Sequence, residues 1–254
     1  MAMVVVVVTG VVLQMVLWAV QRRTGNAATA DAGWTVLVAG GAVAAAILGD
    51  GATTRRVFVA GLAAMWALRL GAYLVRDRVL ARAPEDGRYR ALRERWGRAA
   101  ERNFLFLYLA QVPVAALFVI PIAVAMRGGP LDAWAAAGTA VWFVAVLGES
   151  LADRQLARFR GDPGHHGAVC RAGLWRWSRH PNYFFEWLHW WAYVLIGHAQ
   201  LPTLLGPVMM LAFLFRITGI PYTERQALRS RGDAYRAYQR TTSAFFPWPP
   251  RDAA

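Results

Sequence analysis

The chain has 254 residues, of which 57% are hydrophobic, and its mean hydropathy is +0.32. This composition argues against one or two soluble domains and places the chain in the membrane class. The single cysteine, Cys170, excludes an internal disulfide and a metal site built on cysteines. The placement of the +13 net charge, described below, points to a membrane rather than to nucleic acid.

Seven apolar stretches approach the length that a helix needs to cross a bilayer. A crossing takes roughly 20 mostly apolar residues, because backbone polar groups find no water in hydrocarbon. The stretches are Met3–Val20, Trp34–Leu48, Val57–Val75, Phe104–Ala125, Leu131–Leu147, Tyr183–His198 and Leu201–Ile217. The second is short, and a hairpin-like segment of four residues separates the last two, so six crossings are the alternative. We predict an all-α, polytopic membrane helical bundle of about seven helices, forming one transmembrane domain over residues 1–254.

The first stretch has no basic segment before it and no clear cleavage site after it, so we expect a retained helix rather than a signal peptide. All 28 basic residues are arginines, and most fall in alternate connections between the predicted helices. These connections are residues 21–33, 76–103, 154–181 and the tail from 223, whereas the opposite side carries Arg55, Arg56 and Arg127. The positive-inside rule then places the N-terminus outside and the C-terminus in the cytoplasm. The arginine- and alanine-rich composition favours a bacterial plasma (inner) membrane, and the basic connections suit anionic membrane lipids or a nucleotide's phosphates.

Three of the predicted helices carry polar side chains at helical spacing. Charged groups inside hydrocarbon are costly, so an ionisable residue there is first of all a functional hypothesis. The stripes are Trp66, Arg69, Tyr73 and Arg76 on the third helix, Glu149, Asp153, Leu156 and Arg160 on the fifth, and Asn182, Glu186, His189 and Tyr193 on the sixth. The first two stripes can also be structural, with Arg69 pairing with a buried glutamate. The third needs several partners, which favours a polar cavity.

His165 and His166 are the histidines that a metal site would use. They lie beside Pro163 and Gly164, which indicates a loop. A site there would lack carboxylate or thiol companions at ligand spacing. We therefore expect no metal.

The run GLWRWSRHPNY at 173–183, followed by Glu186, resembles the signature of a superfamily of membrane enzymes. Its members include steroid 5-alpha-reductases, sterol C14-reductases and isoprenylcysteine carboxyl methyltransferases. Two further blocks fit: one from Glu149 to Arg160, and one from Pro221 through Glu224 to the closing Phe245–Pro247. The resemblance covers Leu147–Pro249 and is closest to a bacterial branch catalogued as a domain of unknown function.

The resemblance implies a cofactor-binding half at residues 147–250, with NADPH held at the cytoplasmic mouth of the bundle. The residues expected to bind the cofactor are Asp153, Arg160, Arg179, His180, Asn182, Tyr183, Tyr235 and Arg76. Arginines offer paired donors to phosphate, and the Asp and Asn side chains suit a ribose hydroxyl or the nicotinamide amide. The substrate side departs from the steroid reductases, because Trp66 stands where they carry a tyrosine.

The predicted activity is therefore a membrane-embedded reductase that passes a hydride from NADPH to an activated C=C bond of a lipophilic, steroid- or isoprenoid-like substrate. Glu186 and Tyr73 are the candidate catalytic residues. A first alternative is an S-adenosylmethionine-dependent methyltransferase, whose branch shares Arg179-His180-Pro181 and Tyr183 but usually carries paired glutamates where this chain has Glu224 alone. A second is a non-catalytic lipid-binding protein of the same fold.

Overall fold

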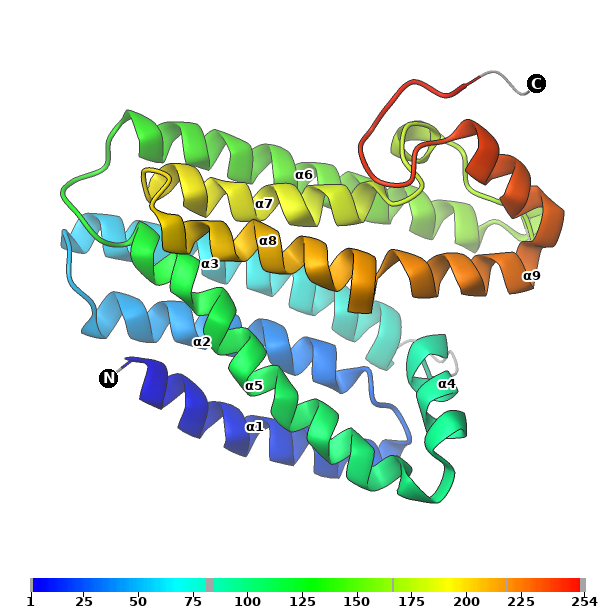
Figure 1. Ribbon diagram of the computed structural model, residues 1–254, viewed down its shortest axis with the longest axis horizontal. Helices are drawn as coiled ribbons and strands as arrows, with labels where there is room; N and C mark the ends of the chain where they lie inside the picture. Colours follow the sequence, from blue (N-terminus) through cyan, green and yellow to red (C-terminus); the bar gives the residue numbers. More distant parts are fainter. Residues whose placement is uncertain (1, 81–84, 166, 218, 252–254) are drawn as a thin grey trace. The chain divides into compact units, whose positions relative to one another are not determined.

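The fold is seen in a computed structural model that describes residues 2–80, 85–165, 167–217 and 219–251 (Figure 1). His166 lies outside these residues. Within them, every element of regular structure is a helix. The chain divides into two compact units: unit 1 comprises Met1–Ala135 and Ile196–Gly206, and unit 2 comprises Ala136–Leu195 and Pro207–Ala254. Most of the predicted cofactor-binding half therefore lies in unit 2.

Unit 1 is built on five helices. They are α1 (Ala2–Thr24), α2 (Thr29–Leu48), α3 (Thr53–Leu74), the short α4 (Gly87–Trp96) and α5 (Ala100–Ala125). Helix α2 packs against α1, α3 and α5. A side chain at Gly41 would overlap Val119 on α5 and crowd Val6 on α1, so this glycine lets three helices approach closely.

Unit 2 contains most of α6 (Ala133–Gly161) together with α7 (Pro181–Ile196), α8 (Leu205–Ala212) and α9 (Ile220–Thr241). A side chain at Gly148 on α6 would overlap the ring of Phe185 on α7, which shows how closely these two helices pack. A π-helical turn, Phe213–Ile217, follows α8. Helix α9 is kinked at Gly232, where φ is +52°, a backbone conformation that favours glycine.

The helices confirm an all-α membrane bundle of about the predicted size. Six helical runs in the described part of the chain are long and apolar enough to cross a bilayer: α1, α2, α3, the run containing α5, α6, and the run from Leu201 to Thr241. The sixth predicted stretch forms α7, whose 16 residues are fewer than the roughly 20 of a typical crossing. The protein is embedded in a membrane.

The third predicted helix ends earlier than its polar stripe requires. Helix α3 stops at Leu74, and a π-helical turn spans Val75–Leu80. Because a π-helix has more residues per turn than an α-helix, Arg76 does not continue the α-helical spacing that joins Trp66, Arg69 and Tyr73. Arg76 is exposed, whereas Trp66 is fully buried.

Candidate functional site

Two of the expected cofactor-binding side chains, Asp153 and Asn182, lie together where the C-terminal part of α6 meets the start of α7. Pro181 begins α7 at a position where proline's fixed backbone angle suits a helix start, so Asn182 lies in the first turn. Its amide nitrogen donates to Asp153 Oδ1 at 3.3 Å. Asp153 is 5% exposed. A buried carboxylate and an amide thus lie side by side where two helices of unit 2 meet.

The same face of α7 continues inward as a buried polar row. Glu186 and His189 are buried, and so is Tyr193, in agreement with the spacing seen in the sequence. The indole of Trp190 donates to Glu186 Oε1 at 3.2 Å, and the ring of His189 lies 3.2 Å from the Tyr193 hydroxyl. The row therefore holds an acid group in a fixed position, one helical turn beyond Asn182.

Three expected cofactor-binding residues converge instead on one carboxylate, that of Glu224 near the start of α9. Arg179 Nε donates to Glu224 Oε1 at 2.7 Å, and His180 Nε2 lies 3.3 Å from the same oxygen. The Tyr235 hydroxyl donates to it at 3.4 Å, and Gln239 Nε2 donates to Oε2 at 2.8 Å. We call these five residues the Glu224 cluster. It ties the loop before α7 to both ends of α9.

Arg179 has further partners within the protein. Its Nη1 donates to the carbonyl oxygens of Gln239 at 3.1 Å and Thr242 at 2.6 Å, which lie at the C-terminal end of α9. Its side chain is 10% exposed. The structure therefore shows Arg179 as a clamp on the end of α9, and its expected contact with a cofactor stays a prediction.

The surroundings of His180 favour its neutral form. Burial lowers the pKa of His180 below its usual value of 6.5, and the nearby Glu224 carboxylate only partly opposes this. The ring stacks in parallel on Tyr183, with 5.3 Å between centroids, and the Tyr183 hydroxyl lies 3.2 Å from Thr223 Oγ1. A neutral histidine that donates through Nε2 presents Nδ1 as an acceptor.

The remaining expected site residues are distributed more widely. Arg160 is exposed near the end of α6, and no contact among the described residues joins it to the Glu224 cluster. Tyr73 belongs to unit 1, where the guanidinium of Arg69 lies 5.8 Å from the centre of its ring. Arg76 is in unit 1 as well.

Sequence reasoning missed Glu224 and Gln239 as members of the site. Glu224 was recognised within the C-terminal block, but nothing in the sequence shows which basic groups it binds. One partner, Arg179, lies 45 residues upstream, and another, Gln239, lies 15 residues downstream, where only the kink at Gly232 lets the helix return to Glu224. The available signal was weaker: Glu224 is the only glutamate of a helix rich in arginine.

The basic connections of unit 1 contain a second polar region, in which several arginines are bound to acids. Asp31, at the start of α2, accepts from Arg78 at 3.1 Å, from Arg88 at 2.6 Å and from the Tyr89 hydroxyl at 2.7 Å. These three donors come from the connection between α3 and α5. These contacts join the start of α2 to that connection.

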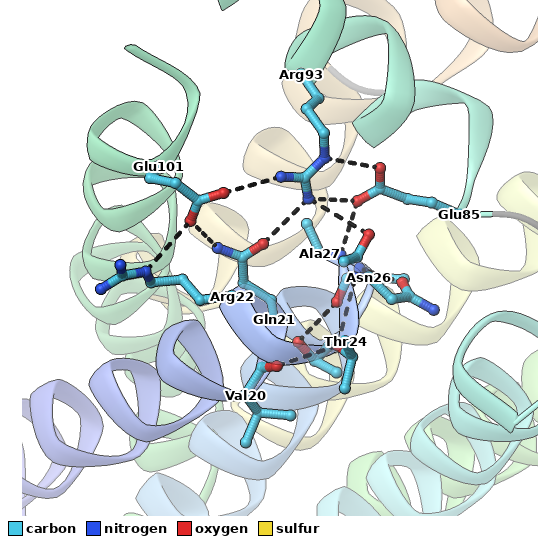
Figure 2. Close-up of polar contacts among 12 residues, drawn as sticks. Val20, Gln21, Arg22, Thr24, Asn26, Ala27, Glu85, Arg93 and Glu101 are labelled. Carbon is cyan, nitrogen blue, oxygen red and sulfur yellow. Dashed lines mark hydrogen bonds and ion pairs between the residues drawn. The ribbon is translucent and has the colours of Figure 1, made fainter. Parts of the chain in front are cut away.

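Figure 2 shows the neighbouring part of this region, where Arg93 of α4 is the centre. Its guanidinium contacts Glu85 and Glu101, each at 3.0 Å, and donates to Gln21 Oε1 at 3.1 Å. Gln21 in turn donates to Glu101 at 2.8 Å. Other arginines of this region are exposed, among them Arg90, Arg95, Arg98 and Arg102, and their binding of lipid headgroups stays a prediction.

Comparisons with known proteins agree with the resemblance seen in the sequence. The chain matches the family described as "Protein of unknown function (DUF1295)" over residues 17–242. It is also 26% identical to the "Uncharacterized protein C594.04c" of the fission yeast Schizosaccharomyces pombe, over 93% of this chain and 77% of the relative. No solved structure matches significantly. The matched residues include the Asp153–Asn182 pair and the whole Glu224 cluster, and the protein belongs to the DUF1295 family within the steroid 5-alpha-reductase superfamily.

Proposed function

We propose that the protein is a membrane-embedded reductase that uses NADPH to reduce an activated C=C bond of a lipophilic, steroid- or isoprenoid-like substrate. Membership of the superfamily supports an enzyme of this general kind. The observation that carries the proposal is the contact between Asp153 and Asn182 at the ends of α6 and α7.

The chemistry of this pair suits the cofactor. A carboxylate can accept from two ribose hydroxyls, and a primary amide offers both a donor and an acceptor to the carboxamide of a nicotinamide. A carboxylate has about four acceptor sites and a primary amide has two N–H donors and a carbonyl, so the single contact between Asn182 and Asp153 does not use all of either group. Because Asp153 is buried, few water molecules compete for it. When bound, NADPH supplies the hydride, and the protein's part is to position the reacting groups.

Glu186 is the proposed acid. Reduction of an activated C=C bond adds a hydride at one carbon and needs a proton at the other, or at the activating carbonyl. Glu186 is buried one turn from Asn182, and Trp190 holds one of its oxygens. The aromatic side chains beside it would keep water from the reacting carbon. Tyr73 on α3 is the second candidate for orienting or protonating the substrate.

The proposed orientation fits this use of the α6–α7 ends. With the N-terminus outside a bacterial plasma membrane and the C-terminus in the cytoplasm, the arginine-rich connections face the cytoplasm. NADPH is a charged nucleotide that cannot enter hydrocarbon, so its site must open on that side. The substrate, being lipophilic, would arrive from the bilayer.

The test is a titration of the purified full-length protein, in detergent, with NADPH. We expect Asn182→Ala and Asp153→Asn each to weaken binding by about tenfold, the equivalent of about one hydrogen bond. Asp233→Asn is the matched control, because this carboxylate lies on α9 in the same unit with its side chain 95% exposed. Wild-type protein that does not bind NADPH, or variants that bind as well as wild type, would overturn the proposal.

The same preparation separates the alternatives. Binding of S-adenosylmethionine without binding of NADPH would identify a methyltransferase. Retention of lipid, with neither cofactor bound, would identify a lipid-binding protein. Either result would replace the reductase proposal.

A further inference from the structure

A polar pocket of about 300 Å³ lies in unit 2 between the end of α9 and the C-terminal tail, which we define as residues 242–251. The described residues that line it include three arginines and no acid: Arg179, Arg240 and Arg251. Ser243 and Trp248 also line the pocket. A pocket with this lining is suited to an anion.

Backbone contacts fix the walls of the pocket. The backbone amide of Arg179 donates to the carbonyl of Ser243 at 2.8 Å. The backbone amide of Trp248 donates to the carbonyl of Trp177 at 3.0 Å. The amide of Arg251 donates to the carbonyl of Thr241 at 2.9 Å. The tail is therefore tied to the loop before α7 and to the end of α9. Because the pocket is already formed, binding of a ligand would lose little affinity to ordering of the tail.

The positive charge of the pocket comes from Arg240 and Arg251. Arg179 is matched by Glu224, as described above. In contrast, within the described part of the chain the side chains of Arg240 and Arg251 make no hydrogen bond or ion pair, and both residues are exposed. Arg240 and Arg251 thus line the pocket, and no acid among the described residues neutralises them.

The end of α9 is the one feature that would oppose an anion, since carbonyl oxygens concentrate negative charge there. In this structure, however, the carbonyls of Gln239 and Thr242 accept from the Arg179 side chain. The carbonyl of Thr241 accepts from the Arg251 amide. The helix end is therefore largely satisfied, and the two full charges of Arg240 and Arg251 dominate.

We propose that this pocket binds a phosphate group through Arg240 and Arg251. The planar guanidinium pairs its N–H groups with phosphate oxygens in a two-pronged contact, and an exposed indole such as that of Trp248 provides a flat apolar surface beside the charge. The phosphate comes from one of two sources. One is the 2′-phosphate that distinguishes NADPH from NADH, a choice that rests on the proposed function; the other is the headgroup of an anionic lipid.

The experiment compares the double variant Arg240→Gln/Arg251→Gln with Arg225→Gln/Arg229→Gln. The control removes two exposed arginines from α9, the helix that carries Arg240, and neither of them lines the pocket. The full-length proteins are titrated with pyrophosphate, NADPH and NADH in detergent. They are also reconstituted in nanodiscs with and without phosphatidylglycerol, and the retained lipid is measured by native mass spectrometry.

We expect the pocket variant to bind pyrophosphate at least about tenfold more weakly than the control, and equal melting temperatures to show that both fold. Loss of affinity for NADPH but not for NADH assigns the phosphate to the cofactor. Loss of retained phosphatidylglycerol assigns it to a lipid. The proposal is wrong if pyrophosphate, NADPH and lipid binding are all unchanged relative to the control. If wild-type protein does not bind NADPH, the reductase proposal fails, and the pyrophosphate and lipid measurements still decide this one.

Discussion

Each unit contains an arginine that joins loops to helix ends, and the two arginines differ in what lies beside them. In unit 1, Arg55 donates to the carbonyls of Gly129 at 3.0 Å and Ile196 at 2.8 Å, and to Asp132 at 2.6 Å. In unit 2, Arg179 joins the loop before α7 to α9, because it donates to Glu224 and to the carbonyl of Gln239 near the end of that helix. The Arg55 side chain is 2% exposed, whereas Arg179 forms part of the wall of a pocket.

The comparison shows that burial and charge do not by themselves mark a functional residue. Arg55 is the more deeply buried of the two, yet its contacts described here are internal to unit 1 and serve to hold the chain together. Arg179 is as fully bonded within the protein, but it lines a pocket together with Arg240 and Arg251, whose side chains make no hydrogen bond or ion pair in the described part of the chain. The proposed phosphate site rests on those two neighbours.

The largest effect is expected from Arg55→Ala, because unit 1 loses a clamp with no replacement. The carbonyls of Gly129 and Ile196 would lose their donor, and each unsatisfied buried group costs about 1–3 kcal/mol. We expect a loss of several kcal/mol, seen as a lower melting temperature in detergent. Arg127→Ala is the control, since Arg127 is exposed on the same side of the bundle. Equal melting temperatures for the two variants would show that Arg55 is not a clamp.

Glu224→Ala tests the corresponding clamp in unit 2. The change leaves Arg179 without its carboxylate and removes the partner of Gln239, but solvent reaches this cluster more readily than it reaches Arg55. We therefore expect a smaller loss, about 2 kcal/mol, measured by thermal unfolding. Glu224→Gln keeps an acceptor and should lose less. A Glu224→Ala protein as stable as wild type would mean that the cluster forms without its central acid.

The features that could be predicted from the sequence are those with a regular pattern along the chain. Hydropathy identified the membrane helices, and the spacing along α7 identified the buried row that contains Glu186. The proximity of Asp153 and Asn182 followed only from the family resemblance. The Glu224 cluster was not predictable, because pairing across loops leaves no regular pattern. The displacement of Arg76 had a similar cause: nothing in a single sequence announces that an α-helix gives way to a π-helical turn.

The same physical limit explains the basic connections. Charge counting predicted that one side of the membrane, expected to be the cytoplasmic one, is strongly positive. It could not tell which arginines are bound to acids and which are exposed. Arg88 and Arg93 are bound, and Arg90 and Arg95 are exposed, although all four lie on one short helix. Only the fold makes this division, because it depends on where Asp31 and Glu85 are.

Lowering the pH should destabilise the surroundings of Arg179 before those of Arg55. Burial lowers the pKa of His180 below 6.5, so the unfolded chain binds the proton more readily than the folded one. The contribution of the neutral His180 ring to the stability of the fold is therefore complete above pH 6.5 and is lost as the pH falls below that value. In unit 1 the capping contact with Ala135 and the contacts with His198 and Arg55 lower the pKa of Asp132 from 3.8 to about 2. The contribution of Asp132 is therefore complete above pH 3.8 and is lost only as the pH falls towards 2.

Hydrogen exchange between pH 7 and pH 5 measures this difference. We expect faster exchange, after correction for the intrinsic pH dependence, in the first turn of α7 and no change around Asp132. His180→Gln should remove the dependence in unit 2. An equal increase in exchange rate in both regions would contradict the assignment to His180.

The smallest effect concerns two glutamines of α1, one of them bonded and the other not. Gln14 and Gln21 are both 0% exposed. Gln21 is bonded to Glu101 and Arg93, whereas the amide atoms of Gln14 have no hydrogen-bond partner among the described residues. Gln14→Leu should therefore stabilise the protein by about 1 kcal/mol, because an unsatisfied amide is replaced by an apolar group of similar size. Gln21→Leu should destabilise it. Opposite shifts in melting temperature are the expected result, and shifts of the same sign would show that burial alone, rather than the contacts of each amide, sets the cost of polar groups in unit 1.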